Sequence, residues 1–142
     1  AKEILLEKEI EILVSLGSGA FAKKHKYVST MYGRKRHTKD IDNRNFQLRS
    51  FAERTAMNHP MQGTAADIIK LAMIAVDAWL TSEQLKSRLI MQVHDELIVE
   101  CPAAEAETVA ALLRREMEAV ASFAVPLIAE AHAGNDWLSA KG

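Results

Sequence analysis

The sequence predicts an α+β domain in which an antiparallel, hairpin-containing sheet packs with helices. Two short apolar runs, residues 88–93 and 97–101, are separated by only three residues, as in a β-hairpin. Segments with helical periodicity lie on both sides of this hairpin. The chain has 142 residues, of which 49% are hydrophobic and 26% charged. This length and composition suit one globular domain and leave no room for two.

The first segments of the chain are expected to be a helix and a joint. Residues 2–14 predict a short amphipathic helix, because apolar residues gather at both of its ends among charged ones. Residues 17–19 are Gly-Ser-Gly, which stops a helix and behaves as a flexible joint. We therefore separate residues 1–19 from a main domain over residues 20–142.

The next segments predict a helix, a strand, a basic loop and a second helix. Residues 20–26 have helical character. Residues 27–31 are rich in β-branched and aromatic side chains, which favour a strand. Gly33 supplies a turn into a loop formed by residues 34–36. A helix is expected from about residue 43 to residue 57.

Proline then divides the helical region in this prediction. Pro60 lacks an N–H group and clashes with the preceding turn, so it should end or kink the first helix. Residues 64–80 are apolar nearly all round, which is typical of a buried helix. After the hairpin, residues 103–122 predict an amphipathic helix and residues 125–131 a last strand.

Charge is distributed very unevenly along the chain. The net charge is −1, yet residues 20–54 hold 10 Lys and Arg against 3 Asp and Glu, and residues 55–142 hold 6 against 12. The basic segment includes residues 23–26 and the run Arg34, Lys35 and Arg36. Such a block is typical of a surface that follows nucleic-acid phosphates, and a solvated basic face is the alternative.

Several classes are excluded by composition. Disorder requires low hydrophobicity and high net charge, and no uncharged apolar run approaches the roughly 18 residues of a membrane span. Charges within the first apolar stretch argue against a signal peptide. The single cysteine, Cys101, cannot form an internal disulfide or a cysteine-type zinc site. We therefore expect a reduced, intracellular protein without a membrane partner.

The turn His94-Asp95-Glu96 is the first candidate for chemistry. Along the preceding strand, Leu89, Met91 and Val93 should face one way and the alternate residues the other. A turn between two strands holds a carboxylate firmly at an exposed tip, which suits a hard cation such as Mg²⁺. The alternative is structural, because aspartate is a common turn residue.

Arg54, Asn58 and Gln62 form the second candidate. Their i, i+4 and i+8 spacing places them on one helical face, subject to the kink expected at Pro60. Side chains that donate hydrogen bonds can reach the N3 and O2 acceptors of a duplex minor groove, which hardly distinguish the two orientations of an A·T pair. The alternative is an ordinary polar, exposed face.

Residues 63–67 are interpreted as structural. Thr64 is expected to cap a helix, with Asp67 three residues later completing a variant of the capping box. The sequence contains no glycine-rich nucleotide loop. Its histidines lack zinc-ligand spacing, and no serine or cysteine lies in a nucleophile motif.

From Tyr27 to Trp137 the chain closely resembles the C-terminal end of family A DNA polymerases, the bacterial DNA polymerase I type. The matching stretches are, in order, residues 27–28, 33–36 and 43–45, then AERTAMNHPMQGTAADIIKLAMIAVDAWL, IMQVHDELIVE, VPLIAE and NDW. They keep the family's order and spacing over roughly the last four fifths of the chain. The set is very specific, although each stretch alone is weak.

The resemblance implies a role for each candidate residue. The QVHDE turn is motif C of the family's palm, which implies that Asp95 helps to bind the two catalytic Mg²⁺ ions and that Glu96 is an accessory carboxylate. It also implies that His94 lies near the primer terminus. Arg54, Asn58 and Gln62 match the residues that contact the primer–template minor groove. The implied reaction is nucleotidyl transfer in DNA replication and repair, in which two metals stabilise the attacking and leaving oxygens.

The chain also departs from the family pattern. Motif A, which carries the other essential aspartate, is absent, and so is the fingers helix that grips the incoming triphosphate. Thumb and exonuclease segments are absent as well, and residues 1–19 match no family segment. The resemblance therefore implies a partial polymerase palm that binds primer–template DNA in the bacterial cytoplasm, near the nucleoid. We expect it to be inactive alone, to bind deoxynucleoside triphosphate only with the missing regions, and to bind metal weakly.

Three other functions remain open at this point. The chain could be a DNA-binding or structural module without chemistry, or a subunit that completes a polymerase in trans. A third alternative is a metal-dependent nuclease that uses Asp95, Glu96 and Glu100. Self-association is also expected, because a buried helix at residues 64–80 would leave apolar surface uncovered without its neighbours.

Overall fold

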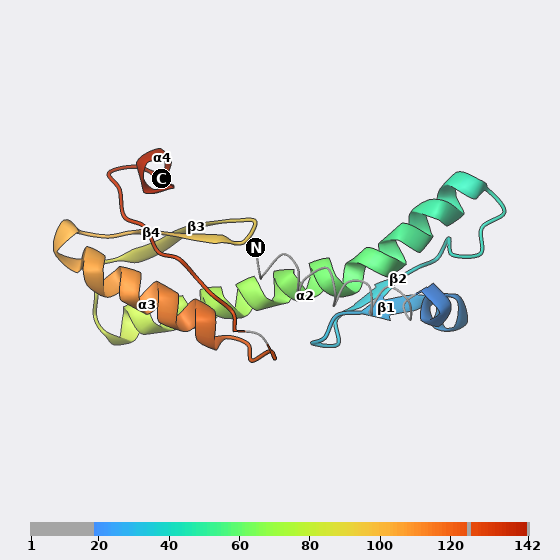
Figure 1. Cartoon of the computed structure of the whole chain (residues 1–142), viewed down its shortest axis with the longest axis horizontal. Coiled ribbons are helices and arrows are strands. Elements are labelled where there is room, and N and C mark those ends of the chain that lie inside the picture. The colour runs from blue at the N-terminus through green and yellow to red at the C-terminus, as the bar shows by residue number, and fades with distance from the viewer. Residues whose placement is uncertain (1–18, 125, 142) are drawn as a thin grey trace. The chain divides into compact units, whose positions relative to one another are not determined.

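The computed structural model describes residues 19–124 and 126–141. Residues 19–25 are helical. The elements that follow are β1 (Tyr27–Ser29), β2 (Lys35–His37), α2 (Phe46–Ser82), β3 (Arg88–Val93), β4 (Glu96–Glu100), the 3₁₀ helix η1 (Ala103–Glu105), α3 (Ala106–Ala119) and α4 (Trp137–Ala140) (Figure 1). The strands form two small antiparallel sheets, β1–β2 and β3–β4. This mixture of helices with antiparallel hairpins confirms the predicted α+β class.

The chain divides into two compact units, the first ending at Asp67 and the second beginning at Ile68. The division falls inside α2, so one helix contributes to both units. The helix predicted over residues 2–14 lies outside the described residues, and the boundary proposed at residue 19 stays a prediction.

In the first unit, β1 and β2 form a hairpin with Val28 opposite Arg36. The prediction of a basic loop at residues 34–36 was wrong, because Lys35 and Arg36 belong to β2. The turn explains the difference: the Thr30 hydroxyl accepts the backbone N–H groups of Tyr32 and Arg34 at 3.2 Å each. Gly33, with φ of 82°, supplies the left-handed position that the turn requires. Turn chemistry therefore overrides the low strand propensity of the basic residues.

Helix α2 runs for 37 residues and contains Pro60 (Figure 1). The predicted end of the first helix before Pro60 was therefore wrong, whereas the alternative, a kink at Pro60, stays a prediction. The Thr64 hydroxyl donates a hydrogen bond to the Pro60 carbonyl, and the buried residues Ala52 and Ala56 hold the preceding turns against the rest of the unit. The expected cap at Thr64 was also wrong, because Thr64 and Asp67 lie inside the helix. Tertiary packing outweighs the local effect of proline here.

The core of the first unit is small and consists largely of short side chains. It joins the helix at residues 19–25, strand β1, the loop after β2 and helix α2 through Ala22, Val28, Ile41, Ala52 and Ala56. Alanine at two successive turns of α2 lets the hairpin lie close to the helix backbone.

The second unit packs the β3–β4 hairpin against the end of α2 and against α3. Val76, Leu80, Val109 and Leu112 form its buried centre. The hairpin predicted over residues 88–101 is confirmed, with Leu89 opposite Val99. The strict alternation predicted for β3 was wrong: a register shift between Leu89 and Met91 leaves Ile90 as an extra residue, and Met91 is 43% exposed.

The C-terminal part is less regular than predicted. The helix expected over residues 103–122 begins as a 3₁₀ turn and ends at Ala119. The strand expected over residues 125–131 was wrong, because residues 126–131 have no regular structure. Instead, the Ala129 N–H donates to the Glu118 carboxylate at 3.0 Å. In the part of the chain that the structure describes, no helix is long and apolar enough to cross a membrane.

Candidate nucleic-acid interface and metal carboxylates

The β3–β4 turn places His94 and Asp95, which were predicted to belong to motif C, at an exposed tip. Val93 pairs with Glu96, so His94 and Asp95 form a two-residue turn. His94 has φ of 53°, a conformation that glycine or asparagine adopts more readily than histidine. The Gln92 side-chain amide donates to the His94 carbonyl at 2.5 Å, which holds the turn in this shape. Both His94 and Asp95 are exposed to solvent.

The two adjacent carboxylates differ in their surroundings. Asp95 lies in the turn and is exposed, whereas Glu96 is half-buried at the start of β4. The Oε1 atom of Glu96 lies 3.5 Å from the Nζ atom of Lys141. Carboxylate oxygens are suitable Mg²⁺ ligands. Among residues 19–124 and 126–141, however, no group of three or more metal-ligating side chains comes together. Asp95 and Glu96 can therefore supply one side of a metal site and not a complete cage.

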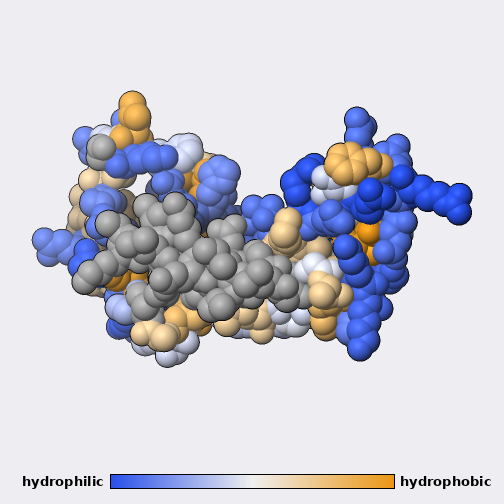
Figure 2. All heavy atoms as spheres, turned by 45° about the vertical axis from the view of Figure 1, so that its right-hand side comes forward, coloured by the Kyte–Doolittle hydropathy of each residue, from blue (hydrophilic) through white to orange (hydrophobic). Residues whose placement is uncertain are grey.

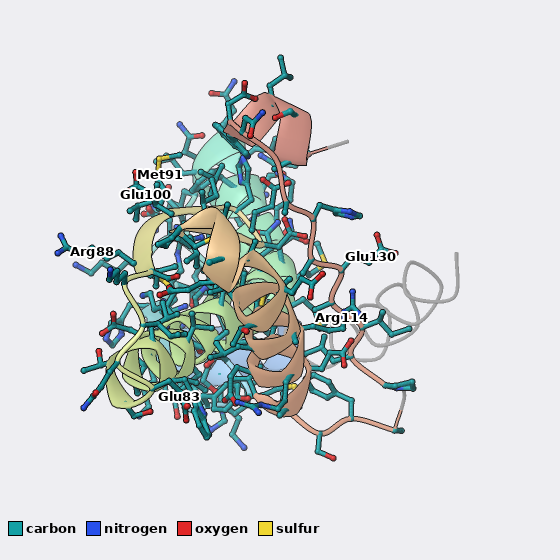
Figure 3. The ribbon with its side chains drawn as sticks, turned by 90° about the vertical axis from the view of Figure 1, so that its left-hand side faces the viewer. Glu83, Arg88, Met91, Glu100, Arg114 and Glu130 are labelled. Carbon is teal, nitrogen blue, oxygen red and sulfur yellow. The ribbon has the colours of Figure 1, made fainter. Side chains whose placement is uncertain are left out.

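Glu100, the third carboxylate of the nuclease alternative, lies at the other end of β4. Four residues of a strand span roughly 13 Å, so Glu96 and Glu100 cannot share one ion through this strand. Glu100 pairs instead with Arg88, directly opposite it on β3. The Arg88 side chain extends outward from the hairpin, away from α3 (Figure 3). The structure does not bring the three nuclease candidates together.

Arg54, Asn58 and Gln62 are all exposed on α2. Because α2 continues through Pro60, their i, i+4 and i+8 spacing forms one continuous row, which we call the groove row. The opposite stripe of the helix is buried; it consists of Ala52, Ala56, His59 and Gly63. Arg54 also donates to the Ser50 hydroxyl at 2.9 Å, which orients its guanidinium along the helix.

The three basic residues after the β1–β2 turn have different surroundings. The Arg34 Nε lies 2.7 Å from the Asp67 Oδ1, and its Nη2 donates to the Gly63 carbonyl at 3.1 Å. The Lys35 Nζ lies 4.4 Å from the centre of the Tyr27 ring, a cation–π contact. Arg36 is exposed and makes no ion pair within the described part of the chain. Hydrophilic side chains gather over the part of the molecule that holds β1, β2 and the first half of α2 (Figure 2).

His59 is a buried polar residue whose position the sequence reasoning missed. It is 8% exposed, and its Nε2 has no hydrogen-bond partner among the described residues. Burial is the main cause that lowers the pKa of His59. A hydrogen bond with the Arg34 backbone opposes it, the positive charges of Arg34 and Arg36 lower the pKa further, and the charge of Asp67 raises it slightly. Its spacing from Ala52 and Ala56, at i+7 and i+3, is the signal that could have placed it on the buried stripe.

Comparison with known proteins gives consistent results. The family model for DNA polymerase family A matches residues 17–139. The chain is 51% identical over 120 residues to DNA polymerase I of Bacillus caldotenax and 50% identical over 120 residues to DNA polymerase I of Bacillus subtilis (strain 168). Each match covers 84% of this chain and 14% of the relative, so the chain spans about one seventh of the length of these relatives.

A solved structure is similar as well. It is the POL domain of Pol1 from M. smegmatis in complex with DNA primer-template and dNTP, with a TM-score of 0.86 and 40% sequence identity. The match covers 90% of this chain and 23% of that chain.

Proposed function

The chain belongs to DNA polymerase family A, and from this premise we propose that it forms part of a DNA-directed DNA polymerase, a nucleotidyltransferase. The observation that carries the proposal is the groove row, which stays continuous and exposed on α2 within the region matched by the family model. The relatives named above are DNA polymerase I, and the similar structure holds DNA primer-template and dNTP. The partner proposed for this chain is therefore a primer–template duplex.

Within this proposal, Arg54, Asn58 and Gln62 donate hydrogen bonds to minor-groove acceptors. These acceptors are nearly the same for both orientations of an A·T pair, so the contact is possible without strong sequence preference. The basic first unit supports the same partner, because exposed Arg36, with Lys35 beside it, can neutralise backbone phosphates. His94, exposed at the β3–β4 turn, is proposed to lie near the primer terminus.

Asp95 is proposed as the metal-binding carboxylate of this part, with Glu96 as its accessory. In the complete enzyme, bound Mg²⁺ would stabilise the charge that develops on the reacting oxygens. Asp95 lies at a rigid turn between two paired strands, which fixes where its carboxylate can be presented. Because the described residues supply only one side of a metal site, we propose that the chain alone is inactive and binds dNTP only together with the missing regions.

Fluorescence anisotropy with a primer–template duplex, measured across a salt series, tests the proposal. We expect affinity to fall steeply as salt rises, because released counterions drive phosphate binding. Arg54→Ala should weaken binding at every salt concentration. Arg114→Ala is the matched control, since Arg114 is an exposed arginine on α3 in the acidic second unit (Figure 3). Absence of binding at low salt, or equal effects of the two substitutions, would contradict the proposal.

A subunit that completes a polymerase in trans is the second candidate. The exposed apolar residues favour it: Ile74 is 67% exposed on α2 and Ile90 is 55% exposed on β3. Primer extension should then appear when the missing N-terminal region is added to this chain, and should remain absent with either piece alone. The same apolar residues support self-association, which sedimentation at increasing concentration would detect. The compartment we propose is the bacterial cytoplasm, near the nucleoid.

A further inference from the structure

Pro60 lies between Asn58 and Gln62 in the sequence of α2 and is buried, whereas the residues of the groove row are exposed. It has no N–H to offer the carbonyl four residues earlier, and its ring crowds that carbonyl. The helix is therefore most easily bent at this point. Such a bend would move Gln62 away from the line set by Arg54 and Asn58.

The β1–β2 hairpin, residues 27–37, contacts α2 on both sides of this proline. Before it, Val28 is 2% exposed and lies in one buried cluster with Ala52 and Ala56. After it, the Met31 N–H donates to the Thr64 hydroxyl at 3.0 Å. The hairpin therefore holds the turns of α2 directly before and after Pro60, both of which lie in the first unit.

Arg34 also contacts α2 beyond the proline. Its guanidinium spans two acceptors on successive turns of α2, the Gly63 carbonyl at 3.1 Å and the Asp67 carboxylate at 2.7 Å. Asp67 is well buried, with 11% of its side chain exposed, so its charge is held close to Arg34. Two charge-assisted hydrogen bonds from one guanidinium fix the orientation of the Arg34 side chain relative to α2 as well as its distance from the helix.

Gly63 permits this close approach. A Cβ atom at position 63 would lie 2.6 Å from the Thr30 Cγ2 and 2.9 Å from the His59 Cε1. The turn of the hairpin therefore rests directly against the helix backbone one residue after Gln62.

We infer that the β1–β2 hairpin bridges Pro60 and keeps the groove row continuous, with Arg34 as the positioning residue for Gln62. The inference rests on the function proposed above, because it assigns the hairpin a task in duplex binding. It also separates Arg34 from Arg36: both are exposed, but the Arg34 guanidinium is paired with Asp67, whereas Arg36 makes no ion pair with a described residue and is available to a phosphate.

The first experiment compares Arg34→Lys, Arg34→Gln and Arg36→Gln in the duplex-binding assay. A lysine keeps the charge but cannot reproduce the two-acceptor fork. We expect both Arg34 variants to bind about three- to tenfold more weakly, the loss expected when one charge-assisted contact is disturbed, with the wild-type salt dependence. Arg36→Gln should instead lower the slope of log affinity against log salt by about 1. Wild-type affinity of Arg34→Lys, together with a reduced slope for Arg34→Gln, would overturn the inference and make Arg34 a phosphate contact.

A double-substitution cycle tests whether Arg34 acts through Gln62. In the Arg34→Gln background, Gln62→Ala should weaken binding by a smaller factor than it does in the wild type, because Gln62 has already been displaced. Equal factors in the two backgrounds would contradict the positioning role.

Amide hydrogen exchange on the free chain gives a measurement that needs no DNA. We expect faster exchange at Met31 and at residues 63–67 in both Arg34 variants, with no change there in Arg36→Gln. Unchanged exchange in the Arg34 variants would overturn the bridging role. If exchange is faster in the Arg34 variants but the wild-type chain binds no duplex, the bridging role of the hairpin is supported and the proposed function is contradicted. Failure of the bridging role can therefore be distinguished from failure of the proposed function.

Discussion

The Oε2 atom of Glu105 lies 2.5 Å from the hydroxyl oxygen of Ser87, eighteen positions earlier in the chain. The same carboxylate accepts the backbone N–H groups of Lys86 and Ser87, each at 3.1 Å. One side chain at the start of α3 therefore holds the segment that leads from α2 into β3. This segment sets where β3 begins, and with it the β3–β4 hairpin that carries Asp95.

The Glu105 contacts predict a pH dependence of stability. The Ser87 hydrogen bond is the main cause that lowers the pKa of Glu105 below its usual value. The Glu105 carboxylate therefore binds a proton more readily in the unfolded chain than in the folded chain. Its contribution to stability is fully present above the unfolded pKa of about 4.3 and is lost as the pH falls through the lower pKa of the folded chain. We expect thermal melts between pH 3 and 5 to show a smaller drop in Tm for Glu105→Gln than for wild type. Glu107→Gln, an exposed neighbour on α3, is the control, and identical pH profiles for Glu105→Gln and wild type would refute the prediction.

Gly63→Ala should destabilise the first unit despite the higher helix propensity of alanine. The added Cβ would overlap Thr30 and His59, and overpacking of this kind costs about 1–3 kcal/mol. The propensity gain of about 1 kcal/mol offsets only part of this. Urea unfolding measures the net loss in free energy of unfolding. Ala65→Gly, at an exposed position of the same helix, calibrates propensity alone, and a more stable Gly63→Ala variant would show that the hairpin does not lie as close as described.

His59 predicts a second pH effect, at higher pH. Burial lowers its pKa in the folded chain, so the unfolded chain binds the proton more readily. Stability should therefore be highest above about pH 6.5, fall as the solution is acidified, and level off below the folded pKa. Denaturant unfolding at pH 7.5 and pH 5 should show this loss in wild type and a smaller one in His59→Met. The same replacement at exposed His132 is the control; if both variants lose as much stability as wild type, the effect does not come from His59.

Magnesium should bind this chain weakly, at the β3–β4 turn. Asp95 and Glu96 offer carboxylate oxygens from one side only, so a dissociation constant on the order of millimolar is expected. An NMR titration should shift the amide signals around His94 and Asp95, and Asp95→Asn should abolish these shifts. A tight site that depends on Asp95 would show that the chain completes its own metal cage.

The sequence predicted the elements whose signals are local. The β3–β4 hairpin follows from two apolar runs and a short polar turn, and the structure keeps it. The row of Arg54, Asn58 and Gln62 follows from helical spacing alone, and its exposure agrees with that spacing. Its contact with DNA stays a proposal.

The errors arise where distant contacts decide the outcome. Pro60 is a helix breaker by local rules, yet the hairpin on one side of α2 supplies packing that no local pattern reveals. Arg34 and Arg36 are equivalent in the sequence and differ only because Asp67, thirty-three residues after Arg34, lies beside one of them. The last predicted strand was wrong because a distant contact is missing. Residues 126–131 have a strand-like composition, but no strand pairs with them within the described residues.

The ion pair between Lys141 and Glu96 gives the chain an intramolecular counterion beside the β3–β4 turn, the proposed motif C. The two side chains are 60% and 38% exposed, so solvent and dissolved cations can reach both partners. If a divalent ion binds Glu96 as proposed, it would compete with the Lys141 ammonium group, and by linkage each would weaken the binding of the other by the same factor. Because Lys141 directly follows the short helix α4, a metal ion at this turn would then be coupled to the contact that holds α4 beside β4.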